Sequence, residues 1–70
     1  MIVKLNCMDS DFKLEVNKHH RNTKSKTGKK IEVVNVNRET GSISKSHYIP
    51  LEAVPEYIKA LTALLEKETL

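Results

Sequence analysis

The spacing of the apolar residues changes at Pro50, and this change limits the possible folds more than any other feature of the chain. Before Pro50, apolar and polar residues alternate, as they do through Phe12, Leu14 and Val16, and period two is typical of a half-buried strand. After Pro50 the apolar residues recur at intervals of three and four, which is the spacing of one helical face: Leu51, Val54, Ile58, Leu61 and Leu65. The chain therefore predicts strands followed by one helix.

Four apolar runs predict strands, over residues 2–8, 11–17, 30–37 and 42–49. The first two form an antiparallel hairpin around a turn near residues 8–11, and Gly41 suits a turn that needs a positive φ. The alternation slips at Val33 and Val34, which predicts either a β-bulge or a strand covered on both faces. The fourth run is less apolar, so we expect it near a sheet edge.

The final segment predicts a short turn over residues 51–54 and a regular helix from about Pro55 to Glu68. Pro55 suits the first helical turn, where a missing N–H costs nothing. We therefore predict a single α+β domain over residues 1–70, in which a four-stranded antiparallel sheet is followed by one C-terminal helix packed on one face (ββββα).

A chain of 70 residues has a small core, so such domains often depend on disulfides, metals or oligomerisation. Cys7 is the only cysteine, and we expect it to be buried in a protein of the reducing cytoplasm. No metal-ligand spacing, signal peptide or membrane-spanning pattern is present in the sequence. Oligomerisation is the remaining source of additional stability. The wide apolar stripe of the helix predicts a homodimer through Tyr57, Ala60, Leu61 and Leu64. Deep packing of the helix on its own sheet is the alternative.

Residues 17–30 (NKHHRNTKSKTGKK) carry six of the twelve Lys and Arg residues and no acid. Their charge is +6 in a chain of net charge +3, so the remaining residues sum to −3. Such segregation favours contacts with phosphates through a flexible connection. The residues expected to make them are Lys18, His20, Arg21, Lys24, Lys26, Lys29 and Lys30. Two alternatives are a solvated loop that aids solubility and a docking site for an acidic protein.

The exposed face of the sheet predicts a second contact surface, because its side chains alternate with those of the core. Lys13, Asn35 and Asn37 are expected there, together with Tyr48. An aromatic ring beside basic residues is typical of surfaces that hold single-stranded nucleic acid by base stacking. His19 and His20 could stack as well, whereas Tyr48 could instead be a packing residue.

Catalysis and cofactor binding find little support in the sequence. The TGKK segment is not a phosphate-binding loop, because that pattern needs a glycine at position 23 and Ser or Thr at position 30, where Thr23 and Lys30 stand. Strand alternation places His47 on the face opposite Ser42, Ser44 and Ser46, which argues against a nucleophile–base pair. We therefore expect a protein that is not an enzyme and needs no cofactor.

The C-terminal third, SISKSHYIPLEAVPEYIKALTALLEK (residues 42–67), resembles the last strand and closing helix of PUR-like repeats. The positions that carry this likeness are Ile49, Pro50, Glu52, Val54, Pro55, Glu56, Tyr57, Ile58, Ala60 and Leu61. Together with the basic connection between the second and third strands, the layout resembles the single-stranded nucleic-acid-binding superfamily of PC4, Whirly and PUR-repeat proteins. The resemblance implies dimers whose helices lie together and whose sheets bind single strands, with Lys13, Asn35, Asn37, Tyr48 and the basic loop as contacts.

These observations predict an intracellular homodimer that binds single-stranded DNA or RNA with little sequence preference and has no membrane partner. The competing hypothesis is a small regulatory or inhibitory module that docks on an acidic protein partner.

Overall fold

The structure, a computed structural model, describes residues 1–19 and 24–69, and at Lys45 the backbone alone. It contains four strands, β1 (Ile2–Lys4), β2 (Ser10–Lys18), β3 (Lys29–Asn37) and β4 (Ile43–Pro50). A short 3-10 helix, η1 (Leu51–Ala53), leads into the helix α1 (Val54–Thr69). The predicted ββββα order and the α+β class are confirmed, and the helix begins within one residue of its expected start.

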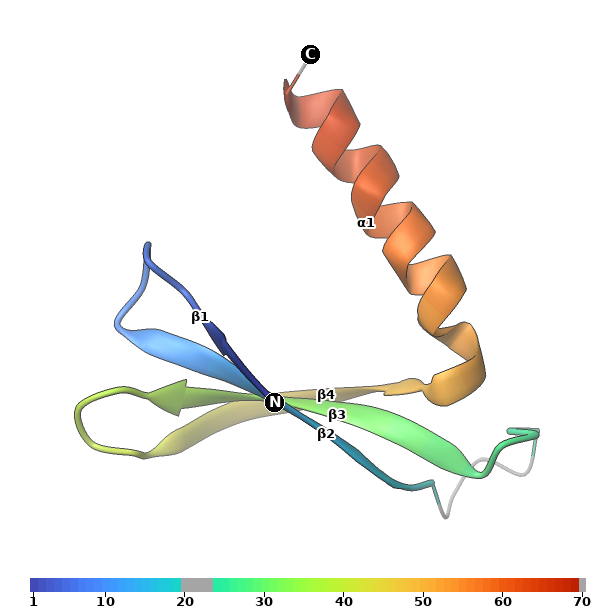
Figure 1. Ribbon diagram of the computed structural model, residues 1–70, viewed down its shortest axis with the longest axis horizontal. Coiled ribbons are helices and arrows are strands. Elements are labelled where there is room, and N and C mark those ends of the chain that lie inside the picture. Colours follow the sequence, from blue (N-terminus) through green and yellow to red (C-terminus); the bar gives the residue numbers. More distant parts are fainter. Residues whose placement is uncertain (20–23, 70) are drawn as a thin grey trace.

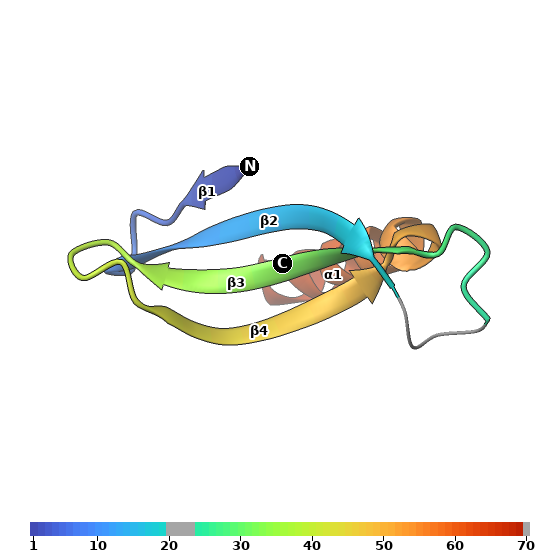
Figure 2. The same ribbon diagram turned by 90° about the horizontal axis from the view of Figure 1, so that it is seen from below.

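The sheet is an antiparallel meander in which sequential strands are neighbours, in the order β1-β2-β3-β4 (Figure 2). β4 lies at an edge, as its lower apolar content predicts. β3 pairs along its length with both β2 and β4, so Val33 lies between Leu14 and His47. Val33 is 8% exposed and is the one hydrophobic residue that is buried within the described part of the chain. The packed core of a single chain is therefore very small.

The two faces of the sheet are distinguished by the strict alternation of β3. Ile31 and Val33 point to the side on which α1 lies, and we call this the inner face. Glu32 and its cross-strand partner Tyr48 belong to the opposite side, the outer face. The register between β2 and β3 is unbroken, so the sequence slip at Val33 and Val34 is not a bulge of β3.

The irregularity in the sheet lies instead between β3 and β4. The consecutive residues Val34 and Asn35 pair with Ser46 and Ser44, so β4 carries one extra residue at position 45. This bulge reverses the alternation of β4. The expectation that His47 faces away from all of the neighbouring serines is therefore wrong for Ser44. Ser44 shares the inner face with His47, and only Ser46 of the two serines within β4 lies on the outer face.

β1 is shorter than predicted, and Cys7 is exposed rather than buried. The strand ends at Lys4 because the next amide, that of Leu5, donates a hydrogen bond to the side chain of Asp11 (3.3 Å to Oδ1). Arg38 closes the same end of the sheet, since its Nη2 donates to the Leu5 carbonyl (3.0 Å) and to Asp11 Oδ1 (2.5 Å). The hydrogen bond from Arg38 is the main reason that the pKa of Asp11 is lowered.

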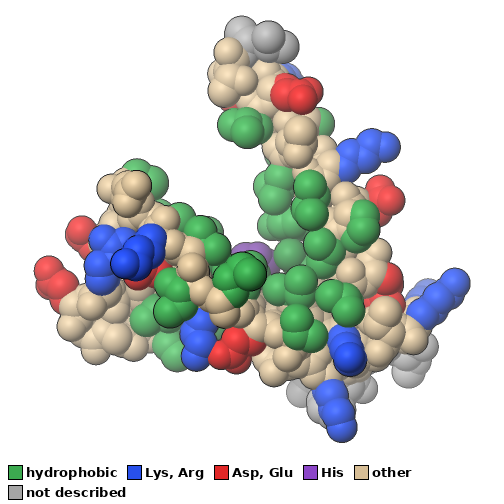
Figure 3. All heavy atoms as spheres, in the orientation of Figure 1, with side chains coloured by type: hydrophobic (Ala, Val, Ile, Leu, Met, Phe, Trp, Pro, Cys, Tyr) green, Lys and Arg blue, Asp and Glu red, His purple; other side chains and the backbone are tan. Residues whose placement is uncertain are grey.

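The helix α1 lies over the inner face but rises away from it along its length, so that sheet and helix form a V in Figure 1. The sequence predicted a helix packed on the sheet. In the structure none of the residues of α1 is buried. Apolar side chains line both arms of the V in the space-filling view (Figure 3). A single chain therefore leaves much of its apolar surface in contact with water.

The position of Val33 generates a stability prediction. Val33→Ala should lower the free energy of unfolding by roughly 1–3 kcal/mol, because it removes buried methyl groups that the neighbouring strands cannot replace. Ile43→Ala is the control, since Ile43 lies on the outer face of the adjacent strand β4 and is 66% exposed; its cost should stay below about 0.5 kcal/mol. Urea denaturation followed by circular dichroism measures both, and equal losses would contradict the placement of the core at β3.

Candidate nucleic-acid interface

Tyr48 stands on the outer face with about half of its surface exposed (52%). The imidazole ring of His19 meets it edge-on, with ring centroids 4.8 Å apart and an angle of 65° between the planes. The Nζ of Lys30 lies 5.0 Å from the tyrosine ring centroid, within the range of a cation–π contact. The structure thus brings an aromatic side chain and a cation together where the basic connection joins the sheet.

His19 was considered in the sequence only as a second stacking residue, but in the structure it is buried. It is 7% exposed, and neither of its ring nitrogens has a hydrogen-bond partner among the described residues. The alternation of β2 contained the signal, because Asp11, Lys13 and Glu15 lie on the outer face and odd numbering continues to position 19. Among the described residues, His19 is the histidine that contacts Tyr48.

Two of the expected cations of the outer face are paired with acids. Lys13 Nζ lies 2.8 Å from Glu15 Oε1, and Lys30 Nζ lies 3.4 Å from Glu32 Oε1. Asn17 Nδ2 donates a further hydrogen bond to Glu32 Oε1 (3.2 Å). The Lys13–Glu15 side chains are about half exposed (45% and 50%), and exposed pairs of this kind contribute little stability. A phosphate group could therefore replace the carboxylate at Lys13 at small cost.

Asn35 and Asn37 do not lie where the sequence analysis expected them. Asn35 pairs with Phe12 and Ser44 on the inner face, because β3 alternates without interruption. Asn37 closes the turn between β3 and β4, where its Oδ1 accepts hydrogen bonds from the amides of Glu39 (2.9 Å) and Thr40 (3.0 Å). Neither asparagine therefore contributes to the outer face.

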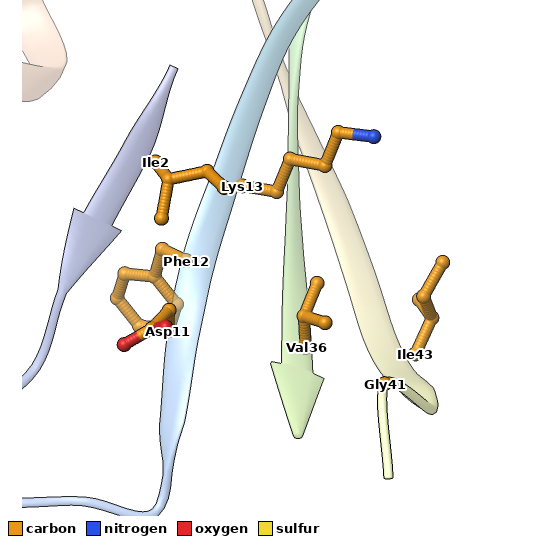
Figure 4. Close-up of a pocket in the computed structure, with 7 residues that line it drawn as sticks. All are labelled: Ile2, Asp11, Phe12, Lys13, Val36, Gly41 and Ile43. Carbon is orange, nitrogen blue, oxygen red and sulfur yellow. The ribbon is translucent and has the colours of Figure 1, made fainter. Parts of the chain in front are cut away.

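At its far end the outer face combines apolar side chains with the charged residues Asp11 and Lys13. A hollow of about 320 Å³ lies there, and Ile2, Val36 and Ile43 reach it from β1, β3 and β4 (Figure 4). Lys13 also lines this hollow. The outer face thus has most of its exposed apolar side chains near the turn between β3 and β4, and its tyrosine near the basic connection.

Residues 17–19 and 24–30 of the basic connection (residues 17–30) are described, and His20 and Arg21 lie outside the described residues. Lys18, Lys24, Lys26 and Lys29 are all exposed. We expected this connection to be flexible, and residues 25–29 make the following hydrogen bonds within it. Gly28 has a φ of 64°, and its amide donates to Ser25 Oγ (3.2 Å). The Lys29 amide donates to Thr27 Oγ1 (3.2 Å).

Glu52 of η1, which is distant in sequence, forms hydrogen bonds with this part of the connection. Its Oε1 accepts a hydrogen bond from the Ser25 hydroxyl (2.7 Å), and its Oε2 accepts one from the Thr27 amide (2.9 Å). These bonds stabilise the charged carboxylate, the Thr27 amide most strongly, and lower the pKa of Glu52 from its ordinary 4.5 to about 2. Glu52 therefore joins the base of α1 to the basic connection.

The inner face and α1 enclose an open groove of about 510 Å³. Its sheet wall includes Phe12, Leu14, Ile31, Val33, His47 and Ile49. Its helix wall consists of Val54, Tyr57, Ile58 and Leu61. Of the residues predicted for a dimer interface, Tyr57 and Leu61 line this groove, while Leu64 lies further along the helix and is 59% exposed. Ala60 is also exposed.

Comparison with protein-family models, with curated proteins and with solved structures finds no significant match. Over residues 1–19 and 24–69, no three His, Cys, Asp or Glu side chains are grouped so that they could hold a metal ion. In the same part of the chain no helix is long and apolar enough to cross a membrane.

The lowered pKa of Glu52 predicts a pH-dependent contribution to stability. Because the folded pKa (about 2) lies below the ordinary 4.5, the ionised Glu52 stabilises the fold above pH 4.5, and this contribution is lost as the pH falls toward 2. Glu52→Gln should therefore lower the Tm at neutral pH, and the difference from the natural protein should shrink toward pH 2. Glu56→Gln, an exposed neighbour on α1, is the control and should leave the Tm nearly unchanged. A Glu52→Gln difference that stays constant between pH 7 and pH 2 would contradict this role.

Proposed function

We propose that this chain is a non-enzymatic nucleic-acid-binding protein that holds single-stranded DNA or RNA with little sequence preference. The basic connection would contact phosphates, and the polar end of the outer face would stack a base on Tyr48. We propose further that the protein works as a cytoplasmic homodimer without a cofactor.

The observation that carries this proposal is the half-exposed Tyr48 with Lys30 and His19 against it. Tyrosine rings beside cations are the usual platform for single strands, since every base presents a π-face and the adjacent phosphate needs a positive charge. The exposed lysines of the basic connection extend from the same end of the sheet. Aromatic and electrostatic contacts would thus be available to one short stretch of nucleic acid.

The order imposed by Glu52 also supports the proposal. A loop that is already held in one conformation loses less conformational entropy on binding than a disordered one. Ser25 and Thr27 are held, whereas Lys26 between them is exposed. Phosphate contacts from such a segment supply affinity but no sequence information, which agrees with binding of low sequence preference.

Salt dependence tests the electrostatic part. If three or four loop charges contact a single strand, log K should fall with log salt concentration at a slope of about −2 to −3. The double variant Lys26→Glu, Lys29→Glu should reduce the magnitude of this slope by about 1.4. The matched control reverses two exposed lysines of α1, Lys59→Glu and Lys67→Glu, and should retain the slope. Fluorescence anisotropy of a labelled oligonucleotide measures all three, and a flat dependence in the natural protein would refute the proposal.

Substitution of Tyr48 distinguishes the nucleic-acid hypothesis from the acidic-protein hypothesis. Tyr48→Ala should weaken oligonucleotide binding roughly 5- to 150-fold, for a stacked base worth about 1–3 kcal/mol, while Tyr48→Phe should retain it. The same titrations provide the measurement, with circular dichroism to check that each variant is folded. Loss of affinity on lysine reversal together with unchanged affinity in Tyr48→Ala would favour the acidic-protein hypothesis instead.

A further inference from the structure

A single chain exposes far more surface than its mass requires. Its accessible surface is 6079 Å², whereas a compact monomer of 8.0 kDa exposes about 4,450 Å². The radius of gyration is 14.2 Å, against about 11 Å for a compact chain of 70 residues. The excess exposed area is about 1,600 Å², because the sheet and α1 do not pack against one another along their length.

The apolar stripe of α1 is too wide for one sheet to cover. At 3.6 residues per turn it spans about 160° of the helix circumference, from Ala60 on one side to Ile58 on the other. A helix that packs on a single surface needs a stripe of about 100°. Leu64 and Leu65 lie beyond the groove wall and are 59% and 64% exposed. A second surface is therefore needed to bury this helix.

The joint between the sheet and α1 keeps the groove open. Pro50 has φ −52° and ψ 139°, and Pro55 follows in the first turn of α1. Between them, Glu52 accepts hydrogen bonds from Ser25 and Thr27 of the basic connection. Closing α1 onto its own sheet would require the backbone to rotate between Glu52, which these bonds hold, and the start of α1.

We propose that the groove of each chain holds the α1 helix of a second copy, in a reciprocal exchange about a two-fold axis. Each helix would pack on the inner face of its partner with one part of its stripe and against the partner's helix with the other. This inference rests on the proposed homodimer but not on nucleic-acid binding.

Length, area and symmetry favour a second copy as the occupant. The 16 residues of α1 are about 24 Å long, and the nine residues of β3 along the groove extend about 30 Å. The excess area of two chains is about 3,200 Å², within the range of obligate homodimers. A two-fold exchange fills both grooves with identical contacts and leaves none unpaired. The outer faces with Tyr48 remain exposed on the two sides of the dimer.

A mixed dimer tests the exchange directly. One chain, Cys7→Ser, carries ¹⁵N; the other is unlabelled Cys7→Ser, Lys59→Cys with a nitroxide on position 59, on the polar side of α1. After the two are unfolded together and refolded, the nitroxide should broaden amide signals of β2 and β3 in the ¹⁵N chain. Broadening confined to α1 would mean that the helices pair outside the grooves, and no broadening with a monomeric mass by light scattering would mean that α1 closes on its own sheet. Either result overturns the proposal.

A second variant needs no label. Leu65→Asp changes a residue that is exposed in a single chain, so it should raise the dimer dissociation constant at least about 100-fold only if a partner buries it. Lys59→Asp, on the side of α1 directly opposite the centre of the stripe, is the control and should leave the dimer intact. An unchanged dissociation constant in Leu65→Asp would overturn the exchange. Oligonucleotide titration of the natural protein is independent of the mixed-dimer and Leu65→Asp experiments. Helix exchange without oligonucleotide binding would refute only the proposed function. Oligonucleotide binding by a monomer would refute only the exchange.

Discussion

The joint at residues 50–55 sets where α1 lies relative to the sheet. Two prolines and the 3-10 turn between them set the direction in which α1 leaves β4. Glu52 extends the joint to the basic connection through its bonds to Ser25 and Thr27. The open groove, the ordered second half of the basic connection and the free outer face all follow from this arrangement. The Glu52 carboxylate therefore connects the start of the apolar helix α1 to the basic connection.

The two faces of the sheet serve different physical purposes. The inner face is apolar and incompletely covered, so it favours further burial by a helix. The outer face combines Tyr48, His19 and Lys30 with exposed charge pairs whose net strength is small. A polyanion would compete with those pairs without disturbing the core. The proposed association and the proposed nucleic-acid binding therefore use opposite faces of the sheet.

Local patterns predicted the elements well, because alternation and helical spacing report burial within one strand or helix. They predicted less where a contact between distant segments decides the outcome. Cys7 was expected to be buried, but the Leu5–Asp11 hydrogen bond ends β1 before it. Asn35 was expected beside Tyr48, but β3 alternates without interruption through Val33 and Val34, so Asn35 shares the inner face with Val33. Of the candidate site, Tyr48 and the described lysines could be selected from the sequence. The alternation of β2 also places His19 on the outer face, but its contact with Tyr48 depends on the register of the strands between them.

The sequence by itself determined the order of strands and helix, the end of the sheet at Pro50 and the concentration of positive charge in one connection. These properties depend on residue type and spacing along the chain. The tertiary structure decided that Glu52 holds the connection, that Lys30 and His19 meet at Tyr48, and that α1 stands away from its own sheet. Each of these depends on the register of paired strands and on the angle of one joint, which bring together residues that no local pattern relates.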